Sequence, residues 1–266
     1  MRLSSKSALL LGFWAVGICH GATLDEYDGF DYSAGASLFL QNGGTGWAGT
    51  WGTPGGLDAT IAASSLAFGG LATSGGSVFT AGSQPPNQGS SVATWIRSLG
   101  TPLGADNTTA YLSFLMRPDA GFGFYGGLNF GSVFVGLSGN QSFYGLEGAG
   151  NNVSLSNVAA TTGQTVLFVM RVDFLTGNDT LSLFINPTSG QPEPGLADVL
   201  KTDLNIGSVN EVVINNYGGF TVDEIRIGST FGDVTPLDST VPEPAFGFGA
   251  GGLALFAVLR AKSRIA

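Results

Sequence analysis

The sequence predicts an all-β protein, folded as an antiparallel β-sandwich or jelly roll, and three observations lead to this fold class. Apolar, β-branched and aromatic residues gather in short runs, which is typical of strands. No long window repeats apolar residues at spacings of three and four, so helix signals are weak. Glycine-rich clusters and turn residues separate the runs at fairly regular intervals. Short strands without helical interludes are typical of sandwiches and jelly rolls.

The strands can be placed in order along the chain. The clearest runs lie at 91–99, 110–117, 165–174, 180–186, 211–215 and 220–227. In 180–186, leucine and isoleucine occupy every second position, as in a strand with one face on a core. Thr176 to Asp179 provide turn residues before this run and predict a hairpin with 165–174.

The N-terminus predicts export. Arg2 and Lys6 form a positive start, residues 8–18 form an apolar stretch of signal-peptide length, and small residues follow at 21–22. We expect a signal peptide at 1–22 that signal peptidase removes. The mature chain would then begin near Thr23.

The C-terminal residues 241–266 fall into three parts. A Pro-rich motif occupies 241–244, residues 245–259 carry no charge, and a basic tail occupies 260–266. We expect 245–259 to form a single transmembrane helix, with the basic tail in the cytoplasm and the preceding chain outside. At ~1.5 Å per residue this span reaches about 22 Å, less than the ~30 Å hydrocarbon core. Such a short span favours transient retention over permanent anchoring.

This three-part tail resembles the PEP-CTERM sorting signal of Gram-negative bacteria that make exopolysaccharide. The residues that carry the resemblance are Val241, Pro242, Glu243, Pro244 and Arg260. The resemblance implies an exosortase substrate, held first in the inner membrane, cut near the motif and then placed at the cell surface or in the extracellular matrix. A plain C-terminal anchor preceded by a Pro-rich turn is the alternative.

Removing both ends changes the composition of what remains. The only Cys and the only His, Cys19 and His20, belong to the predicted signal peptide. The mature chain therefore lacks the residues for a Ser-His-Asp or Cys-His nucleophile, for a disulfide, and for zinc sites built on His or Cys. Residues 23–240 carry eighteen acidic and five basic side chains, which argues against nucleic acid and anionic lipid as partners.

Enzymatic motifs are weak in this chain. Gly121, Gly123 and Gly126 match the G-x-G-x-x-G pattern but lack the strand–turn–helix context in which it binds phosphate. A glycosidase usually needs two carboxylates across a cleft, whereas the neighbours Asp223 and Glu224 are expected on opposite faces of a strand. We therefore expect no enzymatic activity and assign no catalytic residue.

A second resemblance covers the mature domain, which we place at 23–228 with a linker at 229–240. Its pattern consists of 28–32, 42–47 with Trp51, and 223–228. It resembles the laminin G-like and concanavalin-like jelly-roll domains of exported bacterial proteins. The resemblance implies that the first and last strands lie side by side, which would bring 27–32 close to 222–227.

If these ends pair, acidic residues gather at one place. The candidate ligands for a structural calcium ion are Asp25, Glu26, Asp28 and Asp223. Calcium takes about six to eight oxygen ligands from carboxylates, carbonyls and water. An ion here would tie the two ends of a disulfide-free sandwich together. A solvated acidic edge that deters sheet-to-sheet aggregation is the alternative.

Aromatic residues offer another kind of binding site. Trp47 and Trp51 are the candidate sugar-stacking residues, and Tyr125, Tyr144 and Tyr217 would join them on a concave sheet face. Packing in the core is their competing role. We expect an exported structural or adhesive protein of the envelope or exopolysaccharide matrix. A carbohydrate-binding module is the alternative, followed by a polysaccharide hydrolase or lyase.

Overall fold

The computed structural model describes residues 24–56, 58–80, 92–139 and 141–238. The signal peptide expected at 1–22 and the sorting segment expected at 241–266 lie outside these ranges, so both stay predictions. Within the described ranges, no helix is long and apolar enough to cross a membrane.

The fold is all-β, as the sequence predicted. The strands are β1 (Leu24–Asp28), β2 (Gly52–Gly56), β3 (Ala59–Ala62), β4 (Ser77–Thr80), β5 (Val92–Leu103), β6 (Thr108–Phe130), β7 (Val133–Leu137), β8 (Phe143–Gly148), β9 (Asn152–Ala159), β10 (Val166–Phe174), β11 (Asp179–Ile185), β12 (Val199–Leu204) and β13 (Val209–Gly228). One short helix, α1 (Phe231–Val234), follows in the described part of the chain. The named strands pair antiparallel throughout, including the predicted β10–β11 hairpin.

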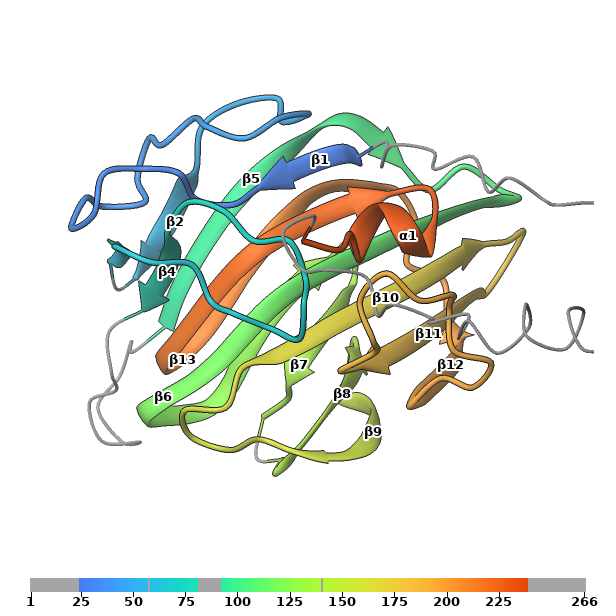
Figure 1. The fold of residues 1–266 in the computed structure, drawn as a ribbon. Helices are drawn as coiled ribbons and strands as arrows, with labels where there is room; N and C mark the ends of the chain where they lie inside the picture. Colours follow the sequence, from blue (N-terminus) through green and yellow to red (C-terminus); the bar gives the residue numbers. More distant parts are fainter. Residues whose placement is uncertain (1–23, 57, 81–91, 140, 239–266) are drawn as a thin grey trace, which may run out of the picture.

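Two long strands, β6 and β13, connect the two layers of the sandwich. The first half of β6 lies between β10 and the second half of β13. The second half of β6 lies between β7 and the first half of β13. Sheet one therefore runs β12-β11-β10-β6-β13-β4-β3, with β1 beside β13. Sheet two runs β9-β8-β7-β6-β13-β5-β2. Figure 1 shows β6 and β13 as long, curved strands through the molecule.

The main core lies between the two sheets. Phe114 of β6 stacks on Phe168 of β10, with ring centroids 4.9 Å apart. Tyr144 of β8 contacts the Phe168 ring from sheet two at 5.0 Å. Because these rings come from both sheets, the two layers pack face to face as a sandwich.

Part of the outer face of sheet one is also buried. Leu66 and Leu71 of the segment 63–76, together with Phe231 and Val234 of α1, form a second hydrophobic cluster with this face. We call residues 63–76 the strap. In Figure 1 the strap (cyan) and α1 lie over β13 and β6. Because both faces are covered, the second half of β13 is buried along its whole length.

The sequence predicted two strands, 211–215 and 220–227, where the structure has one. Register shifts between Tyr217 and Phe220 bend β13 from sheet two into sheet one without ending it. The glycine pattern at 121–126 likewise lies inside β6, where Gly121 has φ = +77°, and the next element is the strand β7.

The first and last strands lie side by side, as the resemblance to jelly-roll domains implied. β1 pairs with the end of β13, so that Tyr27 lies opposite Arg226 and Asp28 lies opposite Ile225. Acidic residues of the two chain ends are therefore neighbours in space, although their side chains face different surroundings.

Residues 229–238 belong to the folded domain. A capping box at Thr230 starts α1. Beyond the helix, the N–H of Asp238 donates a hydrogen bond to the carbonyl oxygen of Gly70 in the strap. The expected linker at 229–240 is therefore wrong for 229–238, because the apolar residues of α1 find partners on sheet one.

Close backbone approach explains a glycine of the 42–47 motif. Gly46 has φ = +82°, and a Cβ there would lie 1.8 Å from the carbonyl oxygen of Asp25. We expect Gly46→Ala to lower the free energy of unfolding by more than about 1 kcal/mol, because alanine adds strain and this overlap. Urea unfolding measures the effect. Gly49→Ala is the control, since a Cβ there meets nothing within 4 Å, and equal stability of the two variants would contradict this packing.

Candidate functional site

Asp28 and Arg97 form a buried ion pair between β1 and β5. Nη1 of Arg97 lies 2.5 Å from Oδ2 of Asp28, and both side chains are 1% exposed. The same Oδ2 accepts hydrogen bonds from Trp51 Nε1 and from the Tyr32 hydroxyl, each at 2.8 Å. Oδ1 accepts one from the N–H of Phe30. Donors of the protein itself thus surround the Asp28 carboxylate.

The two tryptophans predicted as sugar-stacking residues lie around this ion pair. Trp51 is 0% exposed, and the guanidinium carbon of Arg97 lies 5.7 Å from its ring centroid. Trp47 is half-buried, 5.0 Å from the same carbon, and its Nε1 donates to the carbonyl oxygen of Tyr27. Both rings pack on a cation of the protein, and Trp51 presents no ring surface to a ligand.

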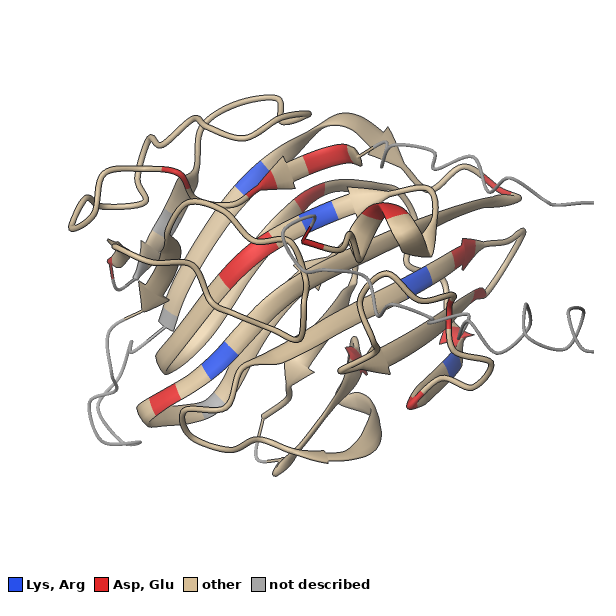
Figure 2. Cartoon of the chain, viewed as in Figure 1, with Lys and Arg blue, Asp and Glu red and all other residues tan. Residues whose placement is uncertain are grey.

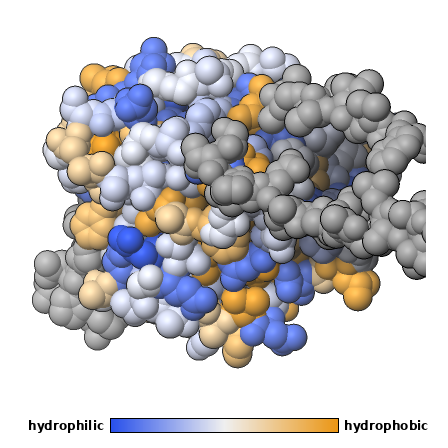
Figure 3. Space-filling model, viewed as in Figure 1, coloured by the Kyte–Doolittle hydropathy of each residue, from blue (hydrophilic) through white to orange (hydrophobic). Residues whose placement is uncertain are grey.

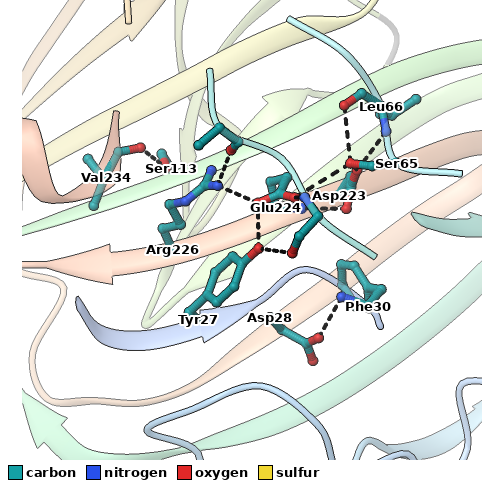
Figure 4. Close-up of polar contacts among 12 residues, drawn as sticks. Tyr27, Asp28, Phe30, Ser65, Leu66, Ser113, Asp223, Glu224, Arg226 and Val234 are labelled. Carbon is teal, nitrogen blue, oxygen red and sulfur yellow. Dashed lines mark hydrogen bonds and ion pairs between the residues drawn. The ribbon is translucent and has the colours of Figure 1, made fainter. Parts of the chain in front are cut away.

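Asp223 and Glu224 point to the same side of β13, contrary to the sequence expectation. Glu224 has φ = +54°, and the pairing with β6 shifts register between Asp223 and Arg226. This bulge turns both carboxylates toward the strap. Ser65 Oγ lies 2.5 Å from Asp223 Oδ2 and 3.5 Å from Glu224 Oε1 (Figure 4).

Each of these carboxylates holds part of the strap. The N–H of Leu66 donates to Asp223 Oδ2 at 2.7 Å, and the N–H of Ser74 donates to Glu224 Oε1. On the other oxygen, Glu224 accepts a hydrogen bond from Arg226. Both carboxylates are 0% exposed, so the strap and the sheet exclude water from them.

Burial changes the protonation of this pair. Loss of water raises the pKa of Asp223 to about 8, and the neighbouring Glu224 carboxylate adds to the rise. Burial also raises the pKa of Glu224, against the lowering effect of Arg226. At neutral pH the structure therefore favours a protonated Asp223 beside a Glu224 that pairs with Arg226.

The four predicted calcium ligands do not form one site. Asp28 faces Arg97 between the sheets, whereas Asp223 faces the strap on the outer side of sheet one. Asp25 is exposed, and Glu26 is buried with Oε2 unpartnered. Burial raises the pKa of Glu26 to about 7. Among the described residues, no group of three or more acidic, Cys or His side chains is placed to hold a metal, so a calcium site here lacks support.

Sheet two has an outer face with which no described segment forms a second hydrophobic cluster, and most of its side chains are partly exposed. Alternate residues of its strands, such as Trp95, Leu128 and Ile214, are buried in the main core. The residues between them are half-buried on the other side: Thr94, Ile96, Tyr125, Asn129, Glu147, Val213, Asn215 and Tyr217. We call this set the open face. On the side of α1 and the strap, hydrophobic residues are interrupted by hydrophilic ones (Figure 3).

A tyrosine side chain on the open face contacts residues of three neighbouring strands that also carry a row of glycines. The glycines, which are paired neighbours on β6, β7 and β8, are Gly127, Gly136 and Gly145. The centroid of the Tyr125 ring lies 4.3 Å from that of Phe134 on β7, and its hydroxyl donates to Glu147 Oε2 on β8 at 3.0 Å. Tyr217 contacts the same ring at 6.1 Å. Contacts with Phe134, Glu147 and Tyr217 thus fix the Tyr125 ring on the outer side of sheet two.

Comparisons with known proteins give only distant likenesses. No protein-family model and no curated protein matches the chain. Domain 4 of a GH43 extracellular arabinanase from Geobacillus stearothermophilus, solved with arabinotriose, is 12% identical with a TM-score of 0.45, covering 70% of this chain and 88% of that one. An alginate lyase from Chlorella virus is 9% identical (TM-score 0.38; 74% and 100% covered). Lectin I-B4 from Griffonia simplicifolia is 11% identical (TM-score 0.33; 60% and 91% covered). At these low scores, no activity or ligand is transferred to this chain.

Sequence reasoning missed Arg97 and the strap. Arg97 is the single charge in β5, an otherwise uncharged strand, and that isolation was an available signal for a buried partner. No comparable signal marks residues 63–76, which carry neither charge nor strand pattern. Tyr125 and Tyr217 were named as aromatic candidates, and the structure places them together on the open face.

Proposed function

We propose that this chain is an exported, non-enzymatic protein of the cell surface or extracellular matrix that binds polysaccharide through the open face. The proposal includes a finer fold class, the concanavalin-like jelly roll. One observation carries it: Phe134 and Glu147 fix the partly exposed Tyr125 ring beside the partly exposed Tyr217 on the outer side of sheet two.

Aromatic rings and side-chain amides together suit a sugar ring. One face of a pyranose presents C–H groups that pack on an aromatic ring, while its hydroxyl groups need donors and acceptors. The open face offers Tyr125 and Tyr217 for the first role. For the second it offers the half-buried amide of Asn129, whose Oδ1 accepts a hydrogen bond from Asn215 Nδ2 at 3.5 Å. Because the Tyr125 ring is already fixed, a ligand would lose little side-chain entropy in ordering it.

The adjacent carboxylates Asp223 and Glu224 do not favour a hydrolase or lyase. Both are 0% exposed beneath the strap, and both already accept hydrogen bonds from its backbone. A catalytic acid or base must lie within hydrogen-bond reach of its substrate. We therefore propose no catalytic residue.

The terminal segments supply the delivery route in this proposal. Signal peptidase would remove 1–22, and 245–259 would hold the intermediate in the inner membrane until an exosortase cuts near 241–244. The three-part pattern of the tail and the signal-peptide pattern of the N-terminus support this route. Exopolysaccharide is the partner it would meet outside the cell.

Affinity electrophoresis in polysaccharide-containing gels tests the binding proposal. We expect the full chain, purified in mild detergent, to be retarded by a polysaccharide. Tyr125→Leu should weaken this binding at least about tenfold, or about 1.4 kcal/mol, because the fixed ring is lost. Tyr125→Phe should keep most of the affinity, because the ring remains.

Phe79→Leu is the matched control for this experiment. It removes an aromatic side chain that is 36% exposed on β4, in sheet one, away from the open face. Thermal melting of each variant separates loss of binding from loss of folding. Undiminished binding by a folded Tyr125→Leu variant would show that the open face is not the binding surface.

A further inference from the structure

Every cation between residues 24 and 238 is paired with a carboxylate. The five basic residues of this region are Arg97, Arg117, Arg171, Lys201 and Arg226. Their partners are, in the same order, Asp28, Asp119, Asp173 with Glu193, Asp203, and Glu224. The gaps in the described region contain no charged residue, so these pairs account for all of its lysines and arginines (Figure 2).

None of the five basic residues belongs to the open face. Arg97 is buried against Asp28 in the sandwich, and Arg226 is buried under the strap. Arg117 and Arg171 lie on the outer side of sheet one, where each pairs with an acid on its own strand. Lys201 of β12 is buried and donates to Asn152 of β9 at 2.8 Å, at the edge of the sandwich.

The charges on and beside the open face are negative. Glu147 accepts the hydrogen bond from the Tyr125 hydroxyl, and Glu211 is exposed at the start of the face on β13. Residues 23–240 as a whole carry eighteen acidic and five basic side chains. An anionic sugar chain would therefore meet like charge at long range and no free cation on contact.

Building on the proposed function, we infer that the ligand is an uncharged polysaccharide. Polyuronates and sulfated glycans are excluded by the absence of a free cation among the described residues of the open face. A polycationic amino-sugar chain would need several free carboxylates along its path. The carboxylates at the open face are Glu147, which already accepts a hydrogen bond from Tyr125, and Glu211. The side chains between them, such as Tyr217 and Asn215, are uncharged.

Three soluble polysaccharides of similar length test this inference with the full chain: an uncharged glucan, a polyuronate such as alginate, and a deacetylated amino-sugar polymer. We expect retention of the chain by the uncharged glucan alone. This retention should be equal at low and high salt, because no ion pair forms, and at least tenfold weaker in Tyr125→Leu. Binding to a charged polymer through ion pairs would instead fall as salt rises.

The outcomes separate the inference from the function on which it rests. Retention by the polyuronate or the amino-sugar polymer that is lost in Tyr125→Leu would overturn the inference and leave the binding function standing. Failure of all three polymers to retain the chain would overturn both. Phe79→Leu, tested beside Tyr125→Leu, again controls for the loss of an exposed aromatic residue elsewhere.

Discussion

Replacing Arg97 by methionine is expected to lower the free energy of unfolding by about 3–5 kcal/mol. Methionine keeps part of the apolar stem but leaves the Asp28 carboxylate, which is 1% exposed, without its counter-charge. The rings of Trp47 and Trp51 also lose the cation that packs on them. Urea denaturation followed by tryptophan fluorescence measures the change.

Arg117→Met is the matched control for this substitution. The Arg117 side chain is 36% exposed and pairs with Asp119 on the same strand, and such surface pairs contribute about 0–1 kcal/mol. Adding Asp28→Asn to Arg97→Met should recover part of the loss, because the buried negative charge is then absent. Equal stability of the Arg97→Met and Arg117→Met variants would mean that the buried pair is not shielded from water as described.

Asp223→Asn is expected to flatten the pH dependence of stability. The folded-state pKa of Asp223 is about 8, raised by burial from an ordinary value of 3.8. Between about pH 4 and pH 8 the folded chain holds a proton that the unfolded chain has lost. This group's stabilising contribution is therefore full at low pH and declines by about 1.4 kcal/mol per pH unit until it is lost above about pH 8.

Free energies of unfolding measured across this pH range for the natural chain and Asp223→Asn check the expectation. The amide cannot titrate, so the variant should lose this part of the slope, although it is less stable at low pH because one hydrogen bond to the strap or to Glu224 is disturbed. Glu26, whose pKa is about 7, adds the same pH dependence to the free energy of unfolding of both proteins, so it does not affect the difference between them. Asp58→Asn, at an exposed position, is the control and should keep the pH dependence of the natural chain. If the free energy of unfolding of Asp223→Asn changed with pH as steeply as that of the natural chain, a protonated Asp223 would be contradicted.

Part of the fold was predictable from local sequence, because the predicted runs correspond to β5, the first half of β6, β10, β11 and β13, whereas no run was placed at β2–β4, β7–β9 or β12. The β10–β11 hairpin follows from alternating apolar residues and a turn of the type that joins antiparallel strands. The pairing of β1 with β13 followed from the resemblance to jelly-roll domains. A hairpin depends on few neighbours, so a single segment carries enough information to predict it. The pairing of β1 with β13 joins the two ends of the domain, and no single segment predicts it.

The candidate site was less predictable, because it depends on contacts between distant segments. Strand alternation would place Asp223 and Glu224 on opposite faces, and a bulge with a left-handed Glu224 overrides it. Trp51 looks like an exposed ligand residue in a glycine-rich loop, yet the carboxylate of Asp28 and the cation of Arg97 bury it. Neither outcome can be read from the neighbouring residues alone.

The packing of residues 229–238 on sheet one limits where the predicted sorting motif can be. Asp238 is hydrogen-bonded to Gly70, and Val241 follows three residues later. At about 3.8 Å per Cα step, Val241 lies no farther than about 11 Å from Asp238. A protease that cuts at 241–244 would therefore have to act close to the folded surface. Otherwise, cleavage would require residues near Asp238 to detach from sheet one first. If the chain is processed at 241–244 as proposed, folding of the domain therefore limits how closely a protease can approach the motif.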